Sequence, residues 1–223
     1  MNKMSAISKT LVILPGAGDR SSPGYASVYE LLVEEAKKRG YSKTVVMSYP
    51  GQASCMTEGE LSLTGAVRYV IGACSEMQGP LILLGRSFGC FVALEMARSM
   101  GENIQEIKLW GPPPFWHTWE VLAKDVDARN AAGQEKGVCF AENVFSTMNP
   151  IESLLKNVTV KTRVVVGTQD KVATPDFVTY LQAIVQNNAF VTFSPLVQGA
   201  GHEVTSSNDP GIVERYIDAL FDT

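Results

Sequence analysis

The feature that most constrains the fold is a regular alternation of short apolar runs with longer amphipathic segments. Each run is too short for a core helix, and several are rich in valine and isoleucine. Runs of this kind are typical of strands that are buried on both faces of a parallel sheet. The six predicted strands are Leu11–Leu14, Thr44–Ser48, Leu81–Leu84, Ile107–Trp110, Arg163–Val166 and Phe190–Phe193.

The segments between these runs carry the signals of helices. Ser27–Glu30 has the spacing of a capping box, and a helix that starts there would end at Gly40. Thr174–Pro175 combines a cap residue with proline at the first helical position, and Asp209–Pro210 repeats this pattern. Strands that alternate with helices predict an α/β fold with a mainly parallel six-stranded sheet flanked by helices. The length fits a single domain over residues 1–223.

One interval interrupts the alternation. Residues 112–150 contain no strand signal and open with three prolines, so we expect a short helical lid or cap insertion there. The interval carries Phe115, Trp116 and Trp119, which would line an apolar substrate pocket or simply pack a small subdomain. His117 lies among them and would be a pocket-wall or surface histidine.

The segment Gly85–Gly89, with the sequence GRSFG, directly follows the predicted strand Leu81–Leu84. It leads into a helical segment that ends near Met100. In a sharp turn from strand to helix, glycines on either side let the neighbouring backbone pass closely while the central side chain stays exposed. Ser87 would then lie at a helix N-terminus, where the dipole favours developing negative charge. The context therefore predicts a nucleophilic serine.

A serine nucleophile needs a base and an acid that orients the base. Asp170 follows the fifth predicted strand, and His202 follows the sixth, within GAGHE. Ser87, Asp170 and His202 therefore all come just after strands, at the sheet edge where open α/β sheets bind ligands. The remaining histidine, His117, lies in the interval instead.

The order serine, aspartate, histidine, together with the segments GRSFG, GTQDKVATP and GAGHEV, resembles the α/β-hydrolase superfamily over nearly the whole chain. The resemblance implies that Ser87 is the nucleophile, that His202 is the general base and that Asp170 holds the imidazole. The first predicted strand begins only ten residues into the chain, which suggests a minimal six-strand version of the fold.

The segment LPGAGD after the first strand resembles the glycine-rich oxyanion loop of the same family. The resemblance implies that the N–H groups of Ala17 and Phe88 form the oxyanion hole and that Gly16 lets the backbone approach the substrate. The sequence departs from the family at Pro15, where a histidine is usual, but the donors are backbone amides and do not depend on that side chain.

Other classes of site are disfavoured. A dinucleotide loop at Gly16–Gly18 would need a third glycine at Ser21 and an acid after the second strand, and both are missing. Two histidines and scattered cysteines leave little for a metal site, so we expect no cofactor and no metal. A net charge of −4 argues against nucleic acid or an anionic membrane as the main partner. The motifs around Ser87, Asp170 and His202 predict a small-molecule acyl substrate instead. Cysteines without pairing motifs and an N-terminus without a secretory pattern predict a cytoplasmic protein.

These observations predict hydrolysis of an ester or thioester through an acyl-enzyme on Ser87. Ser48–Gln52 resembles a segment of thioesterases that serve assembly-line synthesis, so a thioesterase acting on carrier-bound or CoA-bound acyl chains is an alternative. A hydrolase-fold protein that binds a ligand without turnover is an alternative of another class. Arg86, directly before the nucleophile, would pair with a carboxylate below the turn or contact an anionic part of the substrate.

Overall fold

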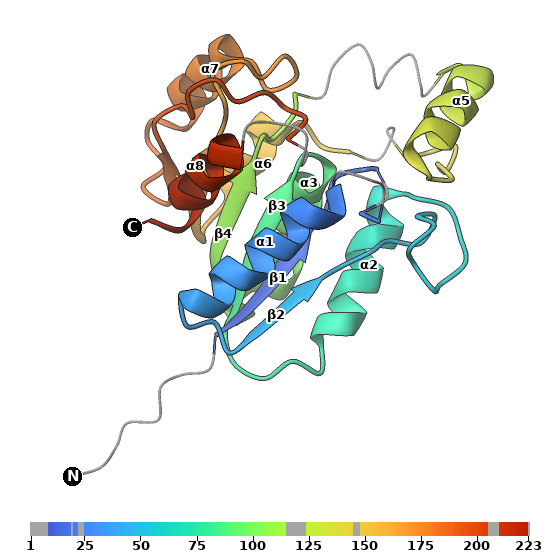
Figure 1. The fold of residues 1–223 in the computed structure, drawn as a ribbon, viewed down its shortest axis with the longest axis horizontal. Coiled ribbons are helices and arrows are strands. Elements are labelled where there is room, and N and C mark those ends of the chain that lie inside the picture. Colours follow the sequence, from blue (N-terminus) through green and yellow to red (C-terminus); the bar gives the residue numbers. More distant parts are fainter. Residues whose placement is uncertain are drawn as a thin grey trace.

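A six-stranded sheet forms the centre of the molecule (Figure 1). The computed structural model describes residues 9–18, 20–21, 25–114, 124–144, 148–204 and 210–222. The strand order is β2-β1-β3-β4-β5-β6, and every neighbouring pair is parallel, which confirms the predicted sheet. The strands are β1 (Thr10–Leu14), β2 (Lys43–Val46), β3 (Leu81–Arg86), β4 (Ile104–Trp110), β5 (Lys161–Val165) and β6 (Val191–Phe193).

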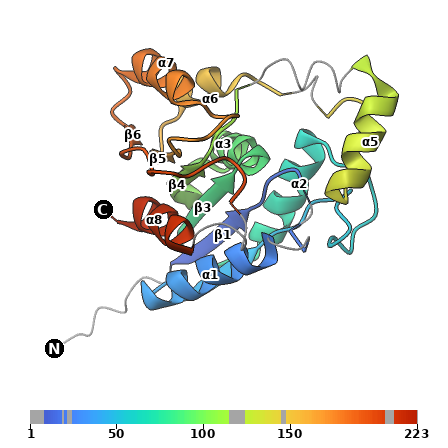
Figure 2. The same cartoon turned by 45° about the horizontal axis from the view of Figure 1, so that its top comes forward.

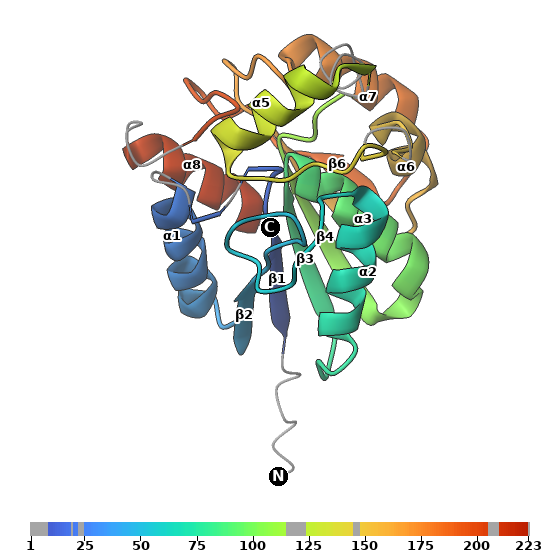
Figure 3. The same ribbon diagram turned by 90° about the vertical axis from the view of Figure 1, so that its right-hand side faces the viewer.

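Helices cover both faces of this sheet (Figure 3). Helices α1 and α8 pack on one face, where they lie side by side (Figure 2), and α2, α3, α6 and α7 pack on the other. Alternate residues of β1 point into the two cores, because successive strand side chains face opposite ways. The helices are α1 (Tyr25–Lys38), α2 (Leu63–Cys74), α3 (Phe88–Met100), α5 (Val126–Lys136), α6 (Ile151–Asn157), α7 (Pro175–Val185) and α8 (Pro210–Phe221).

Two predicted helix starts had different outcomes. Thr174 caps α7, since its hydroxyl oxygen accepts a hydrogen bond from the Phe177 N–H at 3.2 Å. The capping box at Ser27–Glu30 is wrong as a helix start, because the chain is already helical at Tyr25. Ser27 therefore lies in the first turn of α1, and packing of buried Val28 and Leu32 sets the position of that helix instead.

Helix α5 lies within the interval of residues 112–150 and beyond the carboxyl ends of β1 and β2, apart from α7 and α8 (Figures 1 and 2). Ala132 of α5 packs against the core of the sheet domain. The chain that follows the helix adds two isolated β-bridges, from Val138 to Gln52 and from Phe140 to Leu61. The role of this interval as a lid stays a prediction. Within the described residues, every helix is too short or too polar to cross a bilayer.

Candidate active site

The turn between β3 and α3 holds Ser87 in a strained conformation. Ser87 has φ +50° and ψ −116°, and it is the one non-glycine residue with positive φ in the described part of the chain. Such a conformation costs roughly 1–3 kcal/mol and persists only where surrounding contacts fix it. The Ser87 N–H donates to the Trp110 carbonyl at 3.0 Å, and the Ser87 carbonyl accepts from the Cys90 N–H at 2.9 Å. Both neighbours thus hold the turn.

The two glycines of GRSFG are required by backbone contacts. A Cβ on Gly85 would lie 2.4 Å from the Gly89 carbonyl oxygen, and a Cβ on Gly89 would lie 2.0 Å from the Leu14 carbonyl oxygen. A side chain at either position would push α3 away from β3 or from the end of β1. Glycine therefore brings the Phe88 amide, at the start of α3, against the loop that follows β1.

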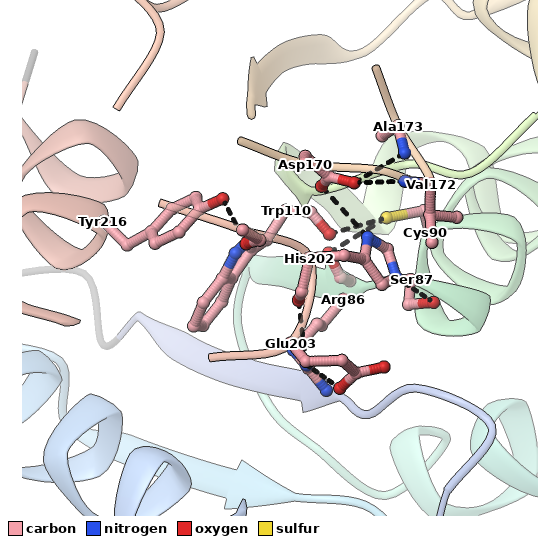
Figure 4. Close-up of polar contacts among 12 residues, drawn as sticks. Arg86, Ser87, Cys90, Trp110, Asp170, Val172, Ala173, His202, Glu203 and Tyr216 are labelled. Carbon is pink, nitrogen blue, oxygen red and sulfur yellow. Dashed lines mark hydrogen bonds and ion pairs between the residues drawn. The ribbon is translucent and has the colours of Figure 1, made fainter. Parts of the chain in front are cut away.

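The structure brings together the three side chains predicted from the sequence (Figure 4). His202 Nε2 lies 3.0 Å from Ser87 Oγ, and His202 Nδ1 lies 3.0 Å from Asp170 Oδ2. The other carboxylate oxygen, Asp170 Oδ1, accepts from the N–H groups of Val172 at 2.8 Å and Ala173 at 2.7 Å. The Asp170 side chain is fully buried, so these bonds hold the carboxylate where it meets the imidazole.

Two further glycines, which the sequence reasoning missed, make room for this arrangement. Gly111 has φ +58°, and a Cβ on it would lie 3.2 Å from His202 Nδ1 and 3.3 Å from Asp170 Oδ2. A Cβ on Gly167 would lie 2.1 Å from the Ala200 carbonyl oxygen. Each glycine comes just after a predicted strand, and that position beside candidate site residues is the signal that could have identified them.

The backbone that carries His202 is held by its carbonyl groups. The carbonyls of residues 200–202 accept, in order, from the Gln169 N–H at 2.8 Å, the Tyr216 hydroxyl at 3.1 Å and Arg86 Nη2 at 3.2 Å. These donors come from the loop after β5, from α8 and from β3. Three separate elements therefore fix the position of the imidazole relative to Ser87.

Arg86 decides between the two alternatives that the sequence left open. Its side chain is buried, and besides the His202 carbonyl it contacts the Glu203 carboxylate at 3.2 Å (Figure 4). The guanidinium also lies over the rings of Tyr25, at 4.8 Å, and Trp110, at 5.5 Å. The structure thus pairs Arg86 with a carboxylate next to the histidine.

Charges around Arg86 are coupled through Glu203. Partial burial raises the pKa of the Glu203 carboxyl, but the hydrogen bond from the Tyr25 hydroxyl and the positive charge of Arg86 outweigh it and lower the pKa below its ordinary value. Burial and the same hydrogen bond raise the pKa of Tyr25 to about 12. Glu203 is therefore ionised and Tyr25 neutral near pH 7, so one carboxylate balances one guanidinium.

The glycine-rich loop after β1 lies directly beside Ser87. A Cβ on Gly16 would lie 3.4 Å from the Ser87 Cβ, so the loop backbone and the serine are in contact. Phe88 is the first residue of α3, and its N–H has no acceptor within the helix. Gln52, from the loop after β2, donates hydrogen bonds to the carbonyls of residues 16–18. Gln52 had no role predicted from the sequence.

Of the predicted substrate-binding residues, the structure describes Gly16 but not the aromatic residues of the 112–150 interval. Phe115, Trp116, Trp119 and His117 lie outside the described residues.

A groove with a volume of about 750 Å³ lies between the loop of residues 51–59 and α5, with Gln52 in its wall. In the part of the chain that the structure describes, no group of three or more His, Cys, Asp and Glu side chains is placed to hold a metal ion.

Comparisons with known proteins identify the fold. No protein-family model and no curated protein sequence matches the chain. Among solved structures, a monoacylglycerol lipase from Paleococcus ferrophilus is similar over 94% of both chains, with 19% identity and a TM-score of 0.67. A thermophilic esterase from Thermogutta terrifontis is 18% identical, covers 87% of this chain and 82% of its own, and has a TM-score of 0.64. Mouse alpha/beta hydrolase domain-containing protein 10 is 15% identical, with coverages of 93% and 86% and a TM-score of 0.61.

Proposed function

We propose that this protein, whose chain has the α/β-hydrolase fold, is a serine hydrolase that cleaves a carboxylic ester or thioester through an acyl-enzyme on Ser87. The observation that carries the proposal is the hydrogen-bonded series from Ser87 through His202 to buried Asp170, which starts at a strained turn. A serine with a base in reach and an acid behind the base is an activated nucleophile.

Acylation begins at Ser87 Oγ. The Nδ1–H of neutral His202 donates to Asp170 Oδ2, so Nε2 carries the lone pair that takes the serine proton. As that proton leaves, Oγ attacks the carbonyl carbon of the substrate. Asp170 then stabilises the imidazolium that has formed, and its own bonds to two backbone amides keep it in place.

The charge that develops on the substrate oxygen falls near the N-terminus of α3. The N–H groups of Phe88 and Ala17 are the proposed donors to this oxygen. Loss of one such donor typically slows an enzyme by about 10²–10³-fold. The imidazolium of His202 gives its proton to the leaving group, and a water molecule, activated by the same imidazole, releases the acyl group.

The decisive experiment is labelling with a fluorophosphonate, followed by mass mapping of the modified residue. We expect the label on Ser87 of the wild-type chain, and we expect Ser87→Ala to lose both labelling and hydrolysis of p-nitrophenyl acetate while its circular dichroism spectrum is unchanged. Removal of a serine nucleophile typically lowers kcat by about 10⁶-fold. Labelling at another residue, or turnover that survives in Ser87→Ala, would reject the proposal.

A matched series of p-nitrophenyl esters and acyl-CoA thioesters identifies the substrate class. Faster turnover of the thioesters at equal chain length would identify the protein as a thioesterase. A ligand that raises the Tm of a chain that no fluorophosphonate labels would instead indicate a binding protein. We also propose a cytoplasmic location, because all four cysteines are unpaired.

A further inference from the structure

We propose that Gln52 is a positioning residue of the active site, which holds the Gly16–Ala17 peptide so that the Ala17 N–H faces the substrate oxygen. This inference rests on the proposed serine hydrolase function and assigns a role to a residue of the loop after β2, which carries no reactive group.

The side chain of Gln52 is buried and uses all of its polar atoms. Nε2 lies 3.1 Å from the Gly16 carbonyl oxygen, 3.4 Å from that of Ala17 and 2.9 Å from that of Gly18. Oε1 accepts from the Tyr49 N–H at 2.8 Å. A primary amide has two N–H donors and an acceptor, so it satisfies both sides of this environment without adding a charge.

The direction of these carbonyls determines the direction of the amides. In a trans peptide the C=O and the following N–H point opposite ways, and all described peptide bonds are trans. A bond from Gln52 to the Gly16 carbonyl therefore turns the Ala17 N–H away from Gln52. The loop meets Ser87 at Gly16, where an added Cβ would lie 3.4 Å from the serine Cβ. The Ala17 N–H, which points away from Gln52, thus lies in the part of the loop that adjoins Ser87.

The backbone of Gln52 is itself held on two sides. Its N–H donates to the Tyr49 carbonyl at 3.0 Å, and it forms a β-bridge with Val138. Gly51, with φ +93°, allows this path, since a Cβ there would lie 2.2 Å from the Leu61 N. An amide on a fixed backbone can hold the oxyanion loop in one orientation before substrate binds, which is what an oxyanion hole needs.

The test compares two variants that remove hydrogen bonds to the same loop. Gln52→Met keeps the length of the side chain and removes the donor to the Gly16 carbonyl. Tyr49→Phe is the matched control, because the Tyr49 hydroxyl donates to the Pro15 carbonyl at 3.1 Å, one peptide earlier, and its ring contact with Phe88 remains. Both changes are expected to lower the Tm, so activity is measured at a temperature where circular dichroism shows each variant folded.

With p-nitrophenyl acetate, we expect Gln52→Met to lower kcat by about 10–100-fold, since a small displacement of a catalytic group costs up to about a hundredfold. KM should stay within about threefold, because the oxyanion forms only in the transition state. Affinity for a short alkyl trifluoromethyl ketone, whose adduct carries an oxyanion, should fall by the same factor as kcat. Tyr49→Phe should change kcat and ketone affinity by less than about threefold.

Gln52→Glu is the second variant and keeps the test decisive if Gln52→Met does not fold. Its carboxyl has the shape of the amide but, when ionised, donates no hydrogen bond. The kcat deficit relative to wild type should therefore shrink as the pH is lowered and the carboxyl is protonated. Equal losses in Gln52→Met and Tyr49→Phe, or a kcat loss without a loss of ketone affinity, would overturn the positioning role. A wild-type chain with no turnover and no label on Ser87 would instead reject the proposed function.

Discussion

Replacing Arg86 with methionine tests whether this side chain positions His202, the proposed base, relative to Ser87. The guanidinium donates to the His202 carbonyl and to the Glu203 carboxylate, each at 3.2 Å. Arg86 directly precedes Ser87, so this one side chain joins the end of β3, next to Ser87, to the loop that carries His202. Methionine fills similar volume beside the Tyr25 ring but offers no donor.

The cost to stability follows from what each partner loses. A hydrogen bond to a charged group contributes about 1.5–3 kcal/mol, and the part-buried His202 carbonyl loses this donor. The Glu203 side chain is 57% exposed, so water replaces its partner at little cost. With about 1 kcal/mol for the contacts with aromatic rings, the expected loss is about 3 kcal/mol. For a chain of this length that lowers the Tm by about 6–12 °C.

The loss of activity is measured on folded enzyme. At temperatures below the unfolding transition, Arg86→Met should lower kcat for p-nitrophenyl acetate by about tenfold. The loss is moderate because Asp170 still holds the His202 imidazole, although the His202 backbone has lost its bond to Arg86. Glu203→Gln is the control: it removes the carboxylate but leaves the bond to the His202 carbonyl, so its kcat should stay within about twofold. If Arg86→Met lowers the Tm yet retains full kcat, Arg86 supports only the fold, and the reasoning about the base is wrong.

Three further predictions concern the same site. Asp170→Asn should lower kcat by about 10⁴-fold with little change in the circular dichroism spectrum, as measured by ester hydrolysis. Gly111→Ala, which puts a Cβ 3.2 Å from His202 Nδ1 at φ +58°, should lower kcat by at least about tenfold and also lower the Tm. Folding lowers the pKa of Glu203, so the ionised carboxylate stabilises the fold above its ordinary pKa of 4.5, and this stabilisation is lost as the pH falls through the folded pKa. The Tm difference between wild type and Glu203→Gln should therefore become smaller in acid. A Tm difference that stays constant with pH would contradict this prediction.

Local sequence signals predicted the parts of the protein that depend on local physics. Each strand was predicted from a short apolar run in the sequence. The glycines that the turn at Ser87 requires are close to it in the chain, so the turn could be predicted from a local motif. Ser27 shows the limit of such signals. Its capping spacing is genuine, yet the helix starts two residues earlier, because burial of an apolar face outweighs one cap.

The roles of Arg86 and Gln52, which hold the loops of the candidate site, could not be predicted from local sequence in the same way. Arg86 and Glu203 are separated by 117 positions, and Gln52 and Gly16 by 36. Which partner such a side chain meets depends on strand order and on loop paths, and neither is encoded near the residue itself. Arginine before a nucleophile therefore left two interpretations open until the fold placed a carboxylate beside it.

The loops that follow β1 and β6 are both held by their carbonyl groups. Gln52 binds the carbonyls of residues 16–18, and Gln169, Tyr216 and Arg86 bind those of residues 200–202. Anchoring a loop through its carbonyls fixes the backbone and leaves the opposite N–H groups or the side chain free to face a substrate. We therefore expect two classes of variant. Changes at Gln52 or Arg86, which hold these loops, should lower the rate of hydrolysis in part, whereas changes at Ser87 should abolish hydrolysis.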